Sequence, residues 1–281
     1  MEDSLLFSRY YPGYHGSAIP SLKWLKANRE RVFGQRESAF DGIPISNDKQ
    51  AELLKDFAEY YEEFSPEAEQ DSDRLYFYQN KMFGFGDAFF LHCVLRHFKP
   101  ANLIEVGSGY SSALMLDTAN EYGLKTKFTF IDPYSTTIRQ VLAKKPVGQY
   151  SLIRQEIQLV DPKIYESLEA NDVLFLDTSH ALKIGSDLST LLFSVLPNLK
   201  KGVIVHIHDI WYPWEYPEKW LKEGRAYNEI YFVRAFLQFN SKYEILFFNS
   251  YVEQEFAASI ATAMPRLSKD CGNGLWLRAM S

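Results

Sequence analysis

The chain has 281 residues, of which 46% are hydrophobic and 23% charged, and its formal net charge is −6. This composition is typical of a globular protein with a sizeable core and excludes a globally disordered chain. The excess of acidic side chains argues against a nucleic-acid partner, because nucleic-acid affinity depends on clustered Lys and Arg. The two cysteines, Cys93 and Cys271, are far apart in the sequence and predict neither a disulfide framework nor a metal site.

The N-terminus carries acids where a signal peptide would carry positive charge, and no apolar run approaches the ~18 residues of a membrane span. We therefore expect no membrane partner and a cytoplasmic location. The sequence leaves open whether the chain forms a homo-oligomer.

Residues 1–82 are predicted to form an N-terminal cap of loops and helix. The segments 10–16 and 40–46 are rich in turn residues and lack strand alternation. After Ser46, apolar side chains recur every three to four residues, which predicts an amphipathic helix that ends near Pro66.

Residues 83–281 are predicted to form a second domain, in which strand and helix signals alternate. This order favours an α/β fold with a mostly parallel sheet and helices on both faces. Strands are expected at residues 102–106, 127–131, 150–154, 172–176, 202–207, 243–249 and 275–280. Helices are expected at residues 87–98, 111–122, 136–142, 162–168, 182–196 and 226–239.

The segment from Leu103 to Ser112 contains an apolar strand, a glycine turn and the start of a helix. Glycine at positions 107 and 109 permits a positive φ and removes Cβ atoms that would block a ligand, while the N–H groups of the next helix point into the same space. Such a turn predicts a ligand that resembles a nucleotide. Two acids accompany it, Glu105 inside the motif and Asp132 at the end of the next strand.

Dinucleotide-binding folds use G-x-G-x-x-G, whereas Ser112 stands here in place of the third glycine. The pattern E-x-G-x-G with an acid at the next strand end resembles class I S-adenosylmethionine (SAM)-dependent methyltransferases. The resemblance implies a Rossmann-like, seven-stranded sheet with an antiparallel last strand. It also implies that SAM is held by Glu105, Gly107, Ser108, Gly109, Ser112, Asp132, Glu156 and Asp177, with Asp132 on the ribose and Glu156 near the adenine.

Five titratable side chains follow two neighbouring strands of the predicted sheet. Asp177 and His180 follow the fourth strand, and His206, His208 and Asp209 lie at the end of the fifth. We interpret His206 as a hydrogen-bonded core histidine, because it lies deeper in its strand. Asp187, at the start of a helix, is interpreted as a cap or hydrogen-bond anchor.

The other side chains of this group allow two interpretations. His180 or His208 could remove a proton from a methyl acceptor while Asp177 and Asp209 orient the base. Alternatively, Asp177, His208 and Asp209 could hold a divalent metal such as Mg²⁺ or Mn²⁺, which would lower the pKa of an acceptor hydroxyl.

The run from Phe175 to Asp209 resembles the branch of these methyltransferases that acts on small molecules, some members of which hold a metal at these two strand ends. Metal-dependent relatives tend to carry paired acids after the fifth strand, and this chain has His208 and Asp209 instead. The resemblance implies O-methylation of a small hydroxylated acceptor that is sugar-like, aromatic or polyketide-like. The ring-rich segment 211–220 is a candidate wall of the acceptor site. A non-catalytic SAM-binding protein and an NAD-type oxidoreductase remain alternatives.

Overall fold

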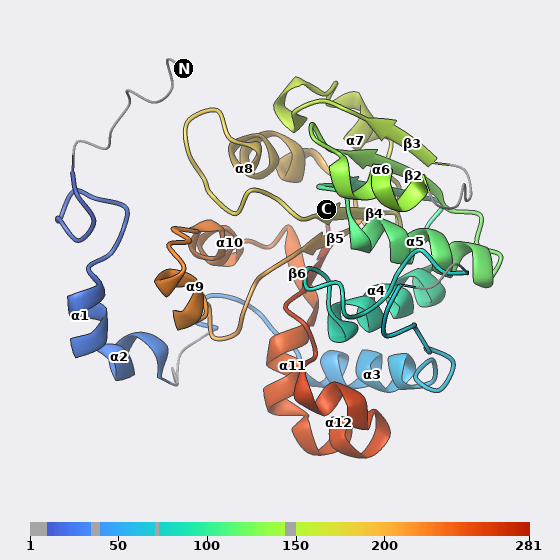
Figure 1. Cartoon of the computed structure of the whole chain (residues 1–281), viewed down its shortest axis with the longest axis horizontal. Coiled ribbons are helices and arrows are strands. Elements are labelled where there is room, and N and C mark those ends of the chain that lie inside the picture. Colours follow the sequence, from blue (N-terminus) through green and yellow to red (C-terminus); the bar gives the residue numbers. More distant parts are fainter. Residues whose placement is uncertain (1–9, 35–39, 71–72, 144–149) are drawn as a thin grey trace.

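The computed structural model describes residues 10–34, 40–70, 73–143 and 150–281, and its centre is a seven-stranded sheet (Figure 1). The strand order is β3-β2-β1-β4-β5-β7-β6, and β7 runs antiparallel to both of its neighbours while the first five strands are parallel. The strands are β1 (Asn102–Val106), β2 (Lys127–Ile131), β3 (Tyr150–Ile153), β4 (Val173–Leu176), β5 (Ile204–Ile207), β6 (Tyr243–Phe248) and β7 (Leu275–Ala279). The predicted Rossmann-like α/β fold is confirmed, and all seven strands lie where the sequence predicts them.

Both faces of the sheet are buried, because successive side chains of each strand point to opposite sides. Leu103 and Phe175, for example, belong to one core layer, and Ile104 and Leu176 to the other. The first layer is covered by α3 (Asn47–Ala58), α4 (Phe85–Phe98), α5 (Tyr110–Glu121), α6 (Thr136–Leu142) and α12 (Ala257–Ala263). The second is covered by α7 (Lys163–Glu166), by the helical turn Leu191–Val195 that continues α8 (Asp187–Thr190), and by α10 (Glu229–Leu237). Parallel strands between two helical layers place all their carboxyl ends at one edge, where ligands of such folds gather.

The described part of the N-terminal cap consists of two unlike pieces. Helices α1 (Leu22–Ala27) and α2 (Arg29–Phe33) contain no buried residue and lie to one side of the sheet (Figure 1). Helix α3, in contrast, places Leu53, Leu54 and Phe57 in the first core layer. The boundary at residue 82 stays a prediction, and residues 1–9, which carried the argument against a signal peptide, lie outside the described residues.

Several helical segments differ from the expectation. Helix α3 ends at Ala58 and not near Pro66. The helix expected at 182–196 begins only at Asp187, because Gly185 has a φ of +70° and the Ser186 side chain caps the first turn. Helices α11 (Asn249–Glu255) and α12 lie between the last two strands, where no helix was predicted. Helix α9 (Glu218–Lys222), directly after Pro217, was not predicted either.

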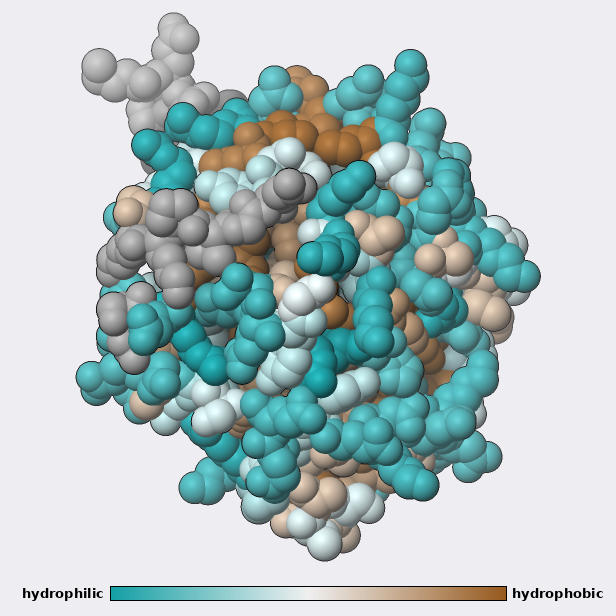
Figure 2. Space-filling model, turned by 90° about the vertical axis from the view of Figure 1, so that its right-hand side faces the viewer, coloured by the Kyte–Doolittle hydropathy of each residue, from teal (hydrophilic) through white to brown (hydrophobic). Residues whose placement is uncertain are grey.

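The exposed surface carries many of the polar and charged side chains, and the charged ones make up 23% of the chain (Figure 2). Figure 2 shows that the face at the right of Figure 1 is mostly hydrophilic, with apolar residues gathered toward its upper edge. Among the described residues, no helix combines the length and the apolar character that crossing a membrane requires.

Candidate active site

The glycine turn after β1 approaches the end of β4 very closely. Gly107 has a φ of +81°, and a Cβ atom at this position would lie 2.0 Å from the backbone oxygen of Asp177. Only glycine fits such a conformation and such a contact. Gly109 differs from the expectation: its φ of −176° is extended, and a Cβ there would meet only Thr137, at an ordinary 3.8 Å. The predicted positive φ is therefore correct for Gly107 and wrong for Gly109.

Glu105 lies beneath the turn, with no solvent exposure. Its two carboxylate oxygens accept hydrogen bonds from the hydroxyl groups of Ser111 and Ser112, and the Ser112 hydroxyl also accepts from the Gly109 N–H. Burial raises the pKa of Glu105 to about 8. In this arrangement Glu105, Gly109 and Ser112 fix the shape of the turn and the start of α5.

Asp132 closes the other side of the turn. Its Oδ2 accepts hydrogen bonds from the Ser108 N–H at 3.2 Å and the Ser108 hydroxyl at 2.8 Å. Its Oδ1 accepts from the N–H groups of Tyr134 and Ser135, both at 2.8 Å. A carboxylate has about four acceptor positions, so a ribose hydroxyl that binds Asp132 has to take the place of the Ser108 hydroxyl.

A cavity of about 390 Å³ opens at the carboxyl ends of β1, β2 and β4 and beside the segment that follows β3. Of the predicted cofactor residues, it is lined by Gly107, Asp132, Glu156 and Asp177. Its other lining residues are Val106, Ile131, Pro133, Tyr134, Ile157, Gln158, Thr178, Ser179, Lys183, Gly185, Ser186 and Asp187. The volume falls within the range of small-molecule sites, and the lining mixes apolar side chains with a few polar groups that can fix an orientation.

One wall of the cavity is the segment between β4 and α8. The Ser179 N–H and hydroxyl each donate a 2.7 Å hydrogen bond to Asp187, which confirms Asp187 as a hydrogen-bond anchor. Gln158 donates to Glu156 at 3.1 Å and to the Gly185 carbonyl at 3.0 Å, and so ties this segment to the one that follows β3.

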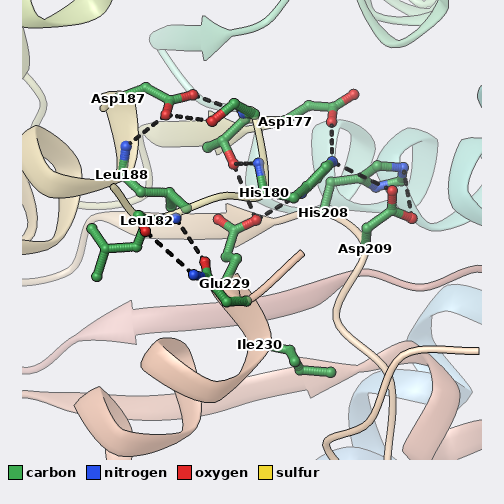
Figure 3. Close-up of polar contacts among 12 residues, drawn as sticks. Asp177, His180, Leu182, Asp187, Leu188, His208, Asp209, Glu229 and Ile230 are labelled. Carbon is green, nitrogen blue, oxygen red and sulfur yellow. Dashed lines mark hydrogen bonds and ion pairs between the residues drawn. The ribbon is translucent and has the colours of Figure 1, made fainter. Parts of the chain in front are cut away.

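His180 lies behind this wall, among three carboxylates (Figure 3). Its Nδ1 is 2.7 Å from Glu229 Oε2, and its Nε2 is 3.4 Å from Asp177 Oδ1 and 3.5 Å from Asp209 Oδ2. Both His180 and Asp209 have a positive φ, +55° and +58°. Non-glycine residues in this conformation cluster at functional sites, where the surrounding structure has to hold them.

The charges in this group depend on one another. Burial by itself lowers the pKa of His180, but Asp177 and Glu229 outweigh it and raise the pKa to about 11. His180 is therefore an imidazolium at neutral pH. The pKa of Asp177 is lowered, because the positive charges of His208 and His180 outweigh its burial, whereas burial raises the pKa of Asp209.

His208 and His206 point toward the first core layer. His206 is 2% exposed, stacks on Phe175 with 4.0 Å between ring centroids, and has its Nε2 3.3 Å from His208 Nδ1. This confirms His206 as a core histidine, and burial lowers its pKa well below the ordinary value. Burial also acts to lower the pKa of His208, but Asp209, Asp87 and Asp177 raise it overall.

The donor set that the sequence suggested for a metal does not fit one in this arrangement. The imidazolium of His180 lies between the carboxylates of Asp177 and Asp209 and supplies the positive charge that a metal would bring. His208 is 3% exposed, and its Nε2 is 3.8 Å from the nearer oxygen of Asp209. Within the described ranges, no group of three or more His, Cys, Asp or Glu side chains has a metal-binding geometry.

Sequence reasoning missed two acids of this group, the half-buried Asp87 and the buried Glu229. Asp87, on α4, accepts a 2.7 Å hydrogen bond from the Asn273 N–H, and burial raises its pKa to about 7. Glu229 is 1% exposed on the first turn of α10. Both acids lie on the first turn of a helix, where an acidic side chain is common because it interacts favourably with the helix dipole. Nothing in the sequence therefore distinguished either residue from an ordinary surface acid.

The ring-rich segment 211–220 packs largely inward. Trp214 and Tyr216 are buried in the second core layer, while Trp211, Tyr212 and Trp220 pack against it at partial exposure. Tyr227 extends this cluster to the site, since its ring lies 5.1 Å from that of His180 and 5.6 Å from that of Trp220. The segment is thus a packed wall beside His180.

Comparisons with known proteins agree with this geometry. Residues 104–210 match the family model described as a methyltransferase domain. An uncharacterized protein of Archaeoglobus fulgidus is 29% identical over 166 residues, which cover 57% of this chain and 74% of that protein.

Two solved structures align over most of the chain at low identity. The SAH-bound Podospora anserina methyltransferase PaMTH1 is 15% identical, with 98% of this chain and all of that chain covered and a TM-score of 0.46. The plantazolicin methyltransferase BpumL in complex with SAH is 16% identical, with 84% and 100% covered and a TM-score of 0.42.

Residues 104–210 thus match a methyltransferase domain, and the Rossmann-like strand order and the glycine turn beside a ligand-sized cavity fit that match.

Proposed function

We propose that this methyltransferase transfers the methyl group of SAM to a hydroxyl oxygen of a small acceptor that is sugar-like, aromatic or polyketide-like. The observation that carries the proposal is the position of Asp177. Its side chain is 38% exposed and lines the cavity, while its Oδ1 lies 3.4 Å from His180 in the buried charge cluster. The donor cavity and the acid–base group therefore share one residue.

When bound, SAM supplies an electrophilic methyl carbon on a positively charged sulfur. The protein aligns the acceptor with that carbon, and alignment provides much of the rate enhancement of such a displacement. The acceptor oxygen forms its bond to the methyl carbon as the carbon–sulfur bond breaks, and the sulfur leaves as a neutral thioether. The proton of the acceptor hydroxyl has to go to a nearby base.

Asp209 is the group best suited to take this proton. Its side chain is 18% exposed, and burial raises its pKa, which makes it a better base than Asp177. His180 is already protonated at neutral pH and acts in this proposal as the charged partner that orients both carboxylates. His208, the other candidate base, is only 3% exposed and its ring packs into the first core layer, against Phe83.

The test measures S-adenosylhomocysteine formed from SAM in the presence of catechol-type phenols, polyketides and sugars. We expect turnover with a member of this panel, and we expect Asp209→Asn to lower kcat by roughly 100-fold, within the range of general-base catalysis. Its SAM affinity by isothermal titration should stay near that of the wild type. Asp48→Asn, on the exposed first turn of α3, is the matched control.

Two results would contradict the proposal. Tight SAM binding without S-adenosylhomocysteine formation from any acceptor would favour a non-catalytic SAM-binding protein. Wild-type turnover in Asp209→Asn would remove Asp209 as the base.

A further inference from the structure

We infer that Glu229 and Asn228 are positioning residues that hold the segment from Thr178 to Leu182 between the donor cavity and the acceptor wall. The inference rests on the proposed function, because the segment contains His180. It concerns the first turn of α10, which lies about 50 residues further along the chain and reaches the segment through side chains and backbone together.

The carboxylate of Glu229 makes the central contact. Its Oε2 lies 2.7 Å from His180 Nδ1 and accepts a 3.0 Å hydrogen bond from the Thr178 hydroxyl. The same hydroxyl oxygen accepts a 3.0 Å hydrogen bond from the His180 N–H. One buried oxygen thus fixes both the ring of His180 and the backbone that carries it (Figure 3).

Backbone groups of α10 continue the contact. The N–H groups of Asn228 and Glu229 both point to the carbonyl oxygen of His180, at 3.0 and 3.3 Å. These are N–H groups of the helix start that have no partner within their own helix. Their attachment to His180 satisfies them and helps to hold its positive φ of +55°.

Asn228 fixes the far end of the segment. Its Oδ1 accepts a 2.7 Å hydrogen bond from the Leu182 N–H, and its Nδ2 donates to the Leu182 carbonyl at 3.3 Å. This amide pairs with the backbone of Leu182 as a neighbouring strand would. It makes no hydrogen bond of its own to cap α10, so the side chain serves the segment and not the helix.

The clamp formed by Asn228 and Glu229 connects two functional surfaces. Thr178 and Ser179 line the donor cavity, and the segment continues into Lys183, which lines it too. On the other side, α10 follows the ring cluster of the acceptor wall, in which Tyr227 contacts His180. An error in the placement of α10 would therefore displace His180 relative to Asp177 and Asp209 while the glycine turn and Asp132 keep their positions.

The first experiment compares Glu229→Gln, Glu229→Ala and the control Glu52→Gln, an exposed residue of α3. We expect Glu229→Ala to lower kcat by about 100-fold, the effect of a displacement of roughly 1 Å at a reacting group, with the KM for SAM within about threefold of the wild type. Glu229→Gln keeps an acceptor oxygen for Thr178 and should retain more activity than the alanine variant. Added formate should restore part of the activity of Glu229→Ala, because a small carboxylate can take the vacated position.

The second experiment does not depend on turnover. Hydrogen exchange of residues 178–187, followed by mass spectrometry without an acceptor, should be faster in Glu229→Ala and in Asn228→Ala than in the wild type and in Glu52→Gln. Unchanged exchange would overturn the clamp even if the enzyme proved to be a methyltransferase. If no acceptor reacts, the proposed function fails while exchange still decides on the clamp.

One further outcome tests the positioning role itself. If Glu229→Ala keeps kcat within twofold of the wild type, or if its loss lies entirely in the KM for SAM, Glu229 does not position His180 for the reaction. If Glu229→Ala does not fold, Glu229→Gln gives the same comparison with a side chain of nearly the same shape.

Discussion

Replacement of Gly107 by alanine is a direct test of the glycine turn that lines the cavity. The new Cβ would start 2.0 Å from the Asp177 backbone oxygen, so the ends of β1 and β4 would have to separate by roughly 1.4 Å to reach an ordinary contact. The positive φ of +81° costs alanine about 1–2 kcal/mol, and the forced separation adds about 1–3 kcal/mol. The free energy of unfolding should therefore fall by about 2–5 kcal/mol.

Gly123→Ala is the matched control. Gly123 also has a positive φ, +64°, but nothing lies within 4 Å of a Cβ at this position. It should lose only the conformational part, about 1–2 kcal/mol. At about 2–4 °C per kcal/mol for a domain of this size, the Tm of Gly123→Ala should fall by about 2–8 °C and that of Gly107→Ala by about 4–20 °C.

Differential scanning calorimetry gives the two Tm values, and isothermal titration gives the SAM affinity. Because the turn lines the donor cavity, Gly107→Ala should bind SAM at least about tenfold more weakly, a loss of about 1.4 kcal/mol, while Gly123→Ala keeps wild-type affinity. The reasoning is refuted if the two variants have the same Tm and the same affinity for SAM.

Three further predictions concern Asp132, the absence of a metal requirement, and Glu105. Asp132→Ala should weaken SAM binding by about 10- to 100-fold, since hydrogen bonds to a charged group contribute about 1.5–3 kcal/mol. Ser108→Ala frees an acceptor position on Asp132 and should bind SAM at least as well as the wild type. Equal losses of affinity in the two variants, measured by isothermal titration, would contradict a ribose contact. EDTA should leave methyl transfer unchanged, because His180 lies between Asp177 and Asp209, and a loss of activity restored by Mg²⁺ would contradict this placement. The pKa of Glu105 in the folded protein, about 8, lies above its ordinary value of 4.5, so its contribution to stability is lost as the pH rises through this interval. Glu105→Gln should therefore show a smaller fall in Tm between pH 5 and pH 8.5 than the wild type, and an unchanged fall would show that Glu105 is not the group that titrates.

Much of the fold could be predicted because its determinants are local. Each strand is a short apolar run. The turn between β1 and α5 carries Gly107, whose φ of +81° is a conformation that side chains other than glycine rarely adopt. Helices α11 and α12 were not predicted, and α8 starts five residues later than expected because Gly185 and Ser186 place its cap further along the chain. Helix starts depend on capping geometry, which composition alone does not determine.

The sequence by itself indicated the α/β fold class and singled out the glycine turn, Asp132 and Asp177, because each lies at the end of an apolar strand and so has a recognisable local pattern. Only the tertiary structure decided the arrangement of charges. Glu229 reaches His180 from a helix 49 positions further along the chain, and the pKa values of both depend on burial and on carboxylates brought together by folding. Contacts between distant segments leave no local pattern in a sequence, and for this reason the residues that set the protonation of His180 could not be read from it.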